Sequence, residues 1–125
     1  TAVMAFQVLL NNSKLEIPAD YPTLLSKALT RIKLYGRFQC IKSEPPVYVD
    51  VAHNPQAALA LSSQLKQTQT AATKTWAIVA MLADKDSATV LGKLIDDIDY
   101  WCFTGMYVDN RGQSASSLFE SVRKS

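Results

Sequence analysis

The sequence predicts an α/β fold: a mostly parallel, Rossmann-like sheet with helices on both faces, preceded by a short helical segment. From residue 36 onward, short and continuously apolar runs alternate with stretches that repeat apolar residues at helical spacing. Continuous apolar strands are typical of a parallel sheet that is buried on both faces. Each connection between parallel strands crosses right-handed and places its helix on the sheet.

Two helices are predicted before residue 36. Residues 2–10 are largely apolar and end at Asn11-Asn12, a pair that favours a helix C-terminus or turn. In residues 22–33, Pro22 suits the first helical turn, and five apolar residues share one face: Leu24, Leu25, Ala28, Leu29 and Ile32. The first helix starts without a capping residue, so we expect these helices to be the end of a larger domain.

After residue 36 the expected order is strand, strand, helix, strand, helix, strand, helix. The strands are expected at residues 37–42, 47–51, 75–81 and 100–104, with Glu-Pro-Pro at 44–46 turning between the first two. Asn54 should cap the helix that Pro55 opens, and Ser114 should cap a last helix over residues 114–123. The inward residues of the first two of these helices are Ala58, Leu61, Leu65, Val90, Leu91, Leu94, Ile95 and Ile98.

Composition excludes several classes of function. The 125 residues carry a formal net charge of +2 with scattered basic residues, which argues against a nucleic-acid-binding surface. No apolar run approaches the length of a membrane span, and the first ten residues lack the basic start of a signal peptide. We therefore expect a cytosolic protein. Cys40 and Cys102 lie in separate strand-like runs, so we expect both thiols to be reduced and buried.

Polar residues follow the predicted strands. Parallel sheets bind ligands beyond the carboxyl ends of their strands. Residues 50–54 (Asp-Val-Ala-His-Asn), 83–86 (Ala-Asp-Lys-Asp) and 109–111 (Asp-Asn-Arg) all occupy such positions. The topology therefore predicts that these three segments share one edge of the domain.

Each candidate residue has a chemical role and a structural alternative. Asp50 can accept hydrogen bonds from the two hydroxyls of a ribose, or it can cap the following turn. His53 can bind a phosphate or lie near a nucleophilic amine, or it can be structural. Arg37 can clamp a phosphate or form a surface ion pair. Lys85 can receive a carboxylate or remain solvated between its acidic neighbours.

Two phosphate-binding motifs are absent from the 125 residues. No GxxxxGK[ST] loop occurs, and no GxGxxG follows a predicted strand. The chain therefore has features of a nucleotide-binding edge without the machinery for phosphoryl transfer.

Four motifs carry a resemblance to a known family. They are GRFQ (36–39), VYVDVAHNPQAA (47–58), AMLADKD (80–86) and RGQSA (111–115). In this order and spacing they resemble folylpolyglutamate synthase/dihydrofolate synthase, a branch of the Mur ligase superfamily. The resemblance implies that residues 36–125 form the family's C-terminal Rossmann-like domain, truncated at its C-terminal end, and that residues 1–35 are terminal helices of the central ATPase domain. Tyr35 stands where the family usually has a proline.

The resemblance also implies an activity, in which ATP phosphorylates a folate or pteroate carboxylate and L-glutamate attacks the acyl phosphate. Arg37 is then expected to contact an ATP phosphate and Asp50 the ribose. His53, as the catalytic residue, and Asn54 should face the acyl phosphate and glutamate, and Lys85 should bind a glutamate carboxylate. The resemblance places the Mg²⁺ ligands in the central ATPase domain, which is the partner of the C-terminal domain in forming the active site. These residues are therefore expected to hold no metal and to be inactive alone.

Two alternatives remain open at this point. One is the C-terminal domain of a peptidoglycan Mur ligase, since D-x-A-H-N-P occurs in several Mur-type enzymes. The other is a stand-alone nucleotide-binding or interaction module.

Overall fold

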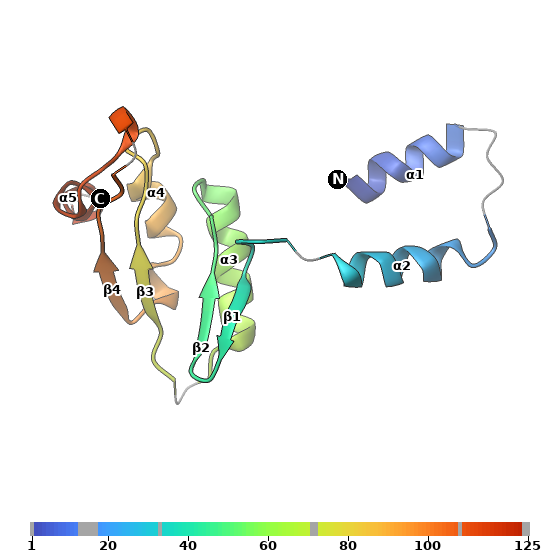
Figure 1. The fold of residues 1–125 in the computed structure, drawn as a ribbon, viewed down its shortest axis with the longest axis horizontal. Helices are drawn as coiled ribbons and strands as arrows, with labels where there is room; N and C mark the ends of the chain where they lie inside the picture. Colours follow the sequence, from blue (N-terminus) through green and yellow to red (C-terminus); the bar gives the residue numbers. More distant parts are fainter. Residues whose placement is uncertain (1, 13–17, 33, 71–72, 108, 124–125) are drawn as a thin grey trace. The chain divides into compact units, whose positions relative to one another are not determined.

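The computed structural model describes residues 2–12, 18–32, 34–70, 73–107 and 109–123 (Figure 1). The chain divides into two compact units, Thr1–Leu34 and Tyr35–Ser125. In the described ranges, no helix combines the length and the apolar character that a membrane crossing requires.

The first unit contains two helices, as the sequence predicts. They are α1 (Ala2–Asn12) and α2 (Tyr21–Arg31). Pro22 lies in the first turn of α2, where its missing N–H leaves no helical hydrogen bond unmade. The rings of Phe6 and Tyr21 lie 6.1 Å apart. Lys33, the last residue of the predicted second helix, lies outside the described residues.

The second unit follows the predicted order of elements. Its elements are β1 (Gln39–Ser43), β2 (Pro46–Val49), α3 (Pro55–Thr68), β3 (Trp76–Val79), α4 (Ser87–Gly92), η1 (Ile95–Asp97), β4 (Tyr100–Phe103), η2 (Asp109–Arg111) and α5 (Ala115–Arg123). The helix expected to bury Val90 through Ile98 is divided into α4 and the 3-10 turn η1. Gly92, a poor helix former, is the last residue of α4.

Both predicted helix caps are present. The Asn54 side chain accepts a hydrogen bond from the Ala57 N–H at 2.9 Å at the start of α3. The Ser114 hydroxyl accepts one from the Ser117 N–H at 3.1 Å at the start of α5. The first amides of a helix have no hydrogen-bond partner inside the helix, and a capping side-chain oxygen accepts from one of them. Asparagine and serine at these positions therefore favour the start of the helix at the next residue.

The strands form two small sheets rather than one. β1 and β2 make an antiparallel hairpin, and β3 pairs with β4 in parallel, with Trp76 opposite Tyr100. The expectation of a mostly parallel sheet therefore holds for one of the two pairs, and no backbone ladder joins β2 to β3 in the described residues. β2 nevertheless runs in the same direction as β3 and β4, so their carboxyl ends lie at one edge (Figure 1).

The core lies on one face of the β3–β4 pair. Helices α3, α4 and α5 all contribute to it, and its buried residues are Ala58, Met81, Val90, Leu91, Leu94 and Leu118. Val79, Trp101 and Phe103 pack against this cluster from the strands. On the opposite face Trp76 is 69% exposed and Ile78 is 79% exposed. Within the described residues the helices therefore cover one face of this pair, whereas the sequence predicted cover on both.

The expectation of buried cysteines is wrong. Cys40 and Cys102 are free thiols, and both are exposed. Successive strand residues point to opposite faces, so Cys102 points away from the core that Trp101 and Phe103 face. Cys40 lies in the two-stranded hairpin, in which the residues after Gln39 are exposed.

Candidate functional site

A tight loop leads from the start of the second unit into β1. Gly36 has a φ of +63°, and a Cβ at this position would lie 3.0 Å from Cγ1 of Val51. The Gly36 N–H donates to Oε1 of Gln39 at 2.9 Å, and the Gly36 carbonyl accepts from the Val51 N–H at 2.9 Å. Both the backbone conformation and the close approach require glycine.

The Asp50 carboxylate holds the other end of this loop. Oδ2 accepts the Phe38 N–H at 2.7 Å, and Oδ1 accepts the Ala52 N–H at 2.7 Å. Asp50 therefore caps the turn after β2, which is the structural alternative weighed for it. A carboxylate offers about four acceptor positions, so each oxygen can still accept a hydrogen bond from a ligand.

The loop leaves Arg37 exposed between two residues with positive φ. Phe38 has a φ of 42°, and its ring stacks on that of Tyr48 with centroids 4.3 Å apart. Arg37 is exposed and has no ion-pair partner among the residues that the structure describes. The surface ion pair considered for Arg37 is therefore not formed within that part of the chain.

His53 and Asn54 lie between β2 and α3. Nδ1 of His53 lies 2.9 Å from the Val51 carbonyl oxygen. A carbonyl only accepts, so Nδ1 donates this hydrogen bond, and Nε2 of the exposed ring is left for another partner. Asn54 uses its side-chain oxygen to cap α3, and this leaves its two amide N–H donors for other partners. Both side chains are thus oriented by local backbone contacts.

Lys85 and Arg111 share the carboxylate of Asp84. The Arg111 guanidinium donates to Oδ2 of Asp84 at 2.9 Å, and the Lys85 ammonium lies 3.4 Å from the same oxygen. The hydrogen bond from Arg111, followed by the charges of both cations, lowers the pKa of Asp84 below 3.8. The Ala83 N–H also donates to the Arg111 carbonyl at 3.0 Å. Lys85 and Arg111 therefore share one carboxylate, and neither cation has the Asp84 side chain to itself.

The structure therefore brings the predicted residues into two groups at one edge. Arg37, Asp50, His53 and Asn54 belong to the loops around the end of β2, and Lys85 belongs to the loop after β3. Figure 1 shows that the loops following β2, β3 and β4 leave from the same edge, as the topology predicts. Sequence reasoning missed Gln39 and the pairing of Arg111 with Asp84. The position of Arg111 after β4, at the predicted edge, was the available signal.

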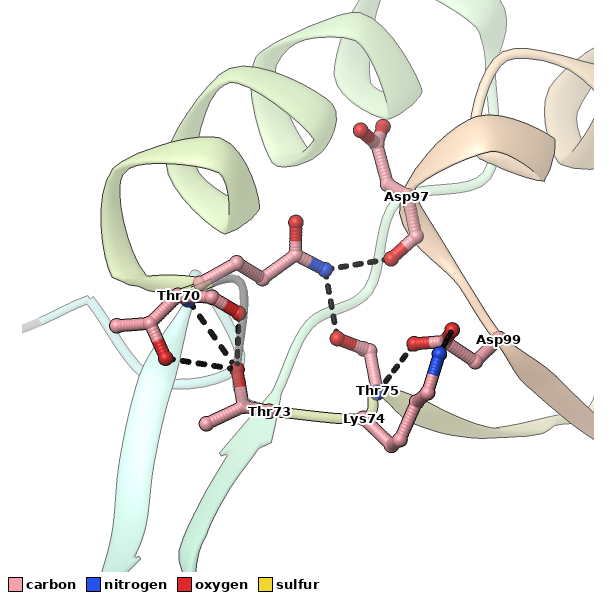
Figure 2. Close-up of polar contacts among 7 residues, drawn as sticks. Thr70, Thr73, Lys74, Thr75, Asp97 and Asp99 are labelled. Carbon is pink, nitrogen blue, oxygen red and sulfur yellow. Dashed lines mark hydrogen bonds and ion pairs between the residues drawn. The ribbon is translucent and has the colours of Figure 1, made fainter.

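A different polar cluster occupies the opposite edge, where β3 and β4 begin (Figure 2). Nε2 of Gln69 donates to the Thr75 hydroxyl at 2.6 Å and to the Asp97 carbonyl at 2.5 Å. The Lys74 ammonium donates to Asp99 at 2.7 Å, which raises the pKa of Lys74 and lowers that of Asp99. These groups satisfy one another around a cavity of about 250 Å³. They join the end of α3 to two strands and are a structural cluster.

The donor set does not fit a resident metal ion. Among the described residues, no three His, Cys, Asp or Glu side chains are placed to bind one. At the candidate edge, the Asp84 carboxylate is shared by two cations, and in the part of the chain that the structure describes Asp50 and His53 are not joined by a third donor that could complete a set with them. No step is therefore assigned to a metal held by these residues.

Comparison with known proteins identifies relatives of this chain. Residues 36–125 match the family described as Mur ligase, glutamate ligase domain. A dihydrofolate synthase/folylpolyglutamate synthase of Haemophilus influenzae is 37% identical over 118 residues, covering 79% of this chain and 26% of the relative. The Escherichia coli protein of the same name is 38% identical over 89 residues, covering 71% of this chain and 21% of its own length.

Solved structures of the same kind of protein also match. A bifunctional folylpolyglutamate synthase/dihydrofolate synthase with Mn, AMPPNP and L-glutamate bound superposes with a TM-score of 0.78 at 35% identity, over 92% of this chain and 27% of the other. The ligand-free enzyme from Yersinia pestis gives a TM-score of 0.77 at 35% identity, with the same shares of the two chains. The chain thus spans about a quarter of the length of the proteins it matches.

Proposed function

This chain belongs to the Mur ligase family through its glutamate ligase domain, residues 36–125, and from that premise we propose that it is part of an ATP-dependent amide ligase. The ligase adds L-glutamate to dihydropteroate, to folylpolyglutamates, or to both. The γ-phosphoryl group of ATP passes to a substrate carboxylate, giving an acyl phosphate and ADP. The amine of glutamate then attacks the acyl carbon, the amide bond forms and phosphate leaves. The names of the similar enzymes support this reaction.

The two units take different roles in this proposal. We assign residues 1–35 to terminal helices of a central ATPase domain and residues 36–125 to the C-terminal Rossmann-like domain. The division of the chain at Leu34 and Tyr35 supports the assignment. We further propose that the enzyme works in the cytosol and that Mg²⁺ is held outside the described residues, since their side chains offer no ligand set for it.

The observation that carries the proposal is the exposed guanidinium of Arg37, which has no ion-pair partner in the described residues and lies in a hydrogen-bonded loop beside Asp50. Arg37 binds a phosphate of ATP, because its fork of N–H donors matches phosphate oxygens and no carboxylate in the described residues competes for it. Asp50 accepts hydrogen bonds from the ribose hydroxyls with the acceptor positions that Phe38 and Ala52 leave open. Nucleotide binding thus depends on the same carboxylate that holds the loop.

The remaining candidates act on the second half of the reaction. His53 presents Nε2 as an acceptor, so it can take a proton from the attacking amine of glutamate. Asn54 donates its amide N–H groups to the acyl phosphate. Lys85 binds a carboxylate of glutamate, and its pairing with Asp84, which Arg111 shares, holds the ammonium at the carboxyl edge.

The reaction is tested with the full-length protein that carries this chain. The protein is assayed with ATP, L-glutamate and either dihydropteroate or a reduced folate, and in parallel with a UDP-muramyl peptide. ADP release and the mass of the product are measured. We expect amide formation with the pterin substrates. Ligation of the muramyl peptide instead would overturn the folate assignment in favour of a peptidoglycan ligase.

Two substitutions test the site assignments in the same assay. Arg37→Ala should raise KM for ATP at least tenfold, since a charge-assisted hydrogen bond contributes about 1.5–3 kcal/mol. Lys85→Ala should raise KM for glutamate by a similar factor and leave KM for ATP nearly unchanged. Arg123→Ala and Lys93→Ala are matched controls, because both residues are exposed and lie at the C-terminal ends of α5 and α4, the ends farthest along each helix from the loops of the candidate edge. An unchanged KM in either site variant would remove that residue from the site.

A further inference from the structure

We propose that Gln39 is a positioning residue for Arg37, so that nucleotide binding depends on a side chain that does not itself contact the nucleotide. The inference rests on the proposed role of Arg37 in binding an ATP phosphate. It starts from the hydrogen bond between Oε1 of Gln39 and the Gly36 N–H, which is 2.9 Å long. This bond closes the segment that carries Arg37 into a four-residue loop.

The loop has an unusual backbone that needs such a restraint. Arg37 stands between Gly36, with φ +63°, and Phe38, with φ 42°. A left-handed conformation at a bulky residue such as Phe38 persists only where surrounding contacts hold it. Without those contacts the loop has other backbone conformations available, and each of them would point the Arg37 side chain in a different direction.

Three other contacts hold this loop, and none of them involves the Gly36 N–H that Gln39 binds. The Phe38 N–H donates to Asp50, the Phe38 ring stacks on Tyr48, and the Gly36 carbonyl accepts from the Val51 N–H. These contacts do not involve the Gly36 N–H, and Oε1 of Gln39 accepts it. Gln39 therefore completes the set of contacts on both sides of Arg37. The Arg37 side chain itself remains exposed and has no ion pair within the described residues.

Positioning matters here because the Arg37 guanidinium must meet its phosphate in a fixed geometry. A preorganised arginine loses less conformational freedom on binding than one on a mobile loop, so restraint of the loop increases affinity without adding a contact. Gln39→Met keeps the length of the side chain and removes the acceptor. We expect this variant to bind nucleotide about threefold to tenfold more weakly, the effect of losing one neutral hydrogen bond.

The test uses the full-length protein and calorimetric titration with AMPPNP. The variants are Gln39→Met, Arg37→Ala and the double variant, with Gln64→Met as a matched control on the exposed surface of α3. If Gln39 acts through Arg37, then Gln39→Met weakens binding in the natural protein and has no further effect once Arg37 is alanine. KM for glutamate should stay as in the Gln64→Met control.

A second measurement reads the loop without any nucleotide. Trypsin cleaves after arginine, so the Arg37–Phe38 bond reports how often the loop leaves its hydrogen-bonded conformation. Cleavage at this bond should be faster in Gln39→Met than in Gln64→Met. Equal rates would overturn the inference, because Gln39 would then not restrain the loop.

The outcomes separate this inference from the proposed function. If Arg37→Ala weakens AMPPNP binding and Gln39→Met does not, only the positioning role is wrong. If the effects of Gln39→Met and Arg37→Ala on AMPPNP binding add in the double variant, Gln39 does not act through Arg37 and the inference fails. It also fails if Gln39→Met lowers nucleotide affinity, glutamate affinity and the thermal midpoint together, because Gln39 is then merely structural. If Arg37→Ala leaves binding unchanged, the proposed role of Arg37 is wrong, and the inference fails with it.

Discussion

The carboxylate of Asp50 and the backbone N–H of Phe38 are joined by a 2.7 Å hydrogen bond across 12 residues of sequence. This bond links the end of β2 to the loop that carries Arg37. A second bond of equal length, from the Ala52 N–H, occupies the other oxygen of the same carboxylate. Asp50 thus has a structural role that is complete before any ligand arrives. The proposed contact of Asp50 with a nucleotide is therefore additional to its structural role.

Replacing Asp50 with alanine should therefore affect structure and ligand binding together. A hydrogen bond to a charged group contributes about 1.5–3 kcal/mol, so each lost bond should lower protection of its amide by roughly ten- to a hundredfold. Amide hydrogen exchange of the peptides containing Phe38 and Ala52 measures this in the full-length protein, and KM for ATP should rise by a similar factor. Asp50→Asn, which keeps one acceptor oxygen, should retain part of the protection. Full protection in Asp50→Ala would contradict the contact.

Gly36→Ala should destabilise the domain. Its φ of +63° costs an alanine about 1–2 kcal/mol, and the added Cβ would lie 3.0 Å from Cγ1 of Val51. Gly92→Ala is the matched control, because a Cβ there has nothing within 4 Å and the residue ends a helix, in which alanine is favoured. Thermal unfolding should show a lower midpoint for Gly36→Ala and an equal or higher one for Gly92→Ala. The opposite order would contradict the geometry of the loop.

Gln69→Ala should loosen the cluster at the edge opposite the site. The Gln69 amide joins the end of α3 to Thr75 and to the Asp97 carbonyl (Figure 2). Gln69 and Thr75 are half-buried and Asp97 is buried. Loss of the amide leaves the Asp97 carbonyl without this donor, at a cost of about 1–3 kcal/mol. Gln64→Ala, on the exposed side of the same helix, should cost almost nothing. Chemical unfolding of the two variants compares them, and equal stability would show that solvent replaces the contact.

The ionisation of Asp84 should depend on Arg111. Hydrogen bonding from Arg111, and then the charges of Arg111 and Lys85, lower the pKa of Asp84 below 3.8. Since the folded-state pKa is depressed, the stabilisation is present above pH 3.8 and is lost as the pH falls through the lowered value. Titration of the ¹³C-labelled carboxyl by NMR should show a higher pKa in Arg111→Met, approaching 3.8, and a smaller rise in Lys85→Met. An unchanged pKa in Arg111→Met would mean that the pair does not form in solution.

Local patterns in the sequence predicted the parts of the fold that depend on near neighbours. The caps at Asn54 and Ser114, the order of strands and helices, and the edge shared by residues after β2 and β3 all agree with the structure. A cap joins residues three positions apart, and the spacing of apolar residues identifies the buried face of a helix. Such signals need no knowledge of the remaining chain.

Contacts between distant residues were decided only by the tertiary structure. The pairing of Arg111 with Asp84 spans 27 residues, and neither residue type nor local spacing identifies the partner. The hydrogen bond between Asp50 and the Phe38 amide was likewise not predictable from residue type or local spacing. The outward direction of Cys102 also depended on the tertiary structure, since an apolar strand does not reveal which of its faces a helix will cover. The sequence alone determined which elements form and which polar residues stand at their ends. The packing of α3, α4 and α5 on one face determined which of those residues meet, because hydrogen bonds act over about 3 Å and depend on where the chain brings their groups.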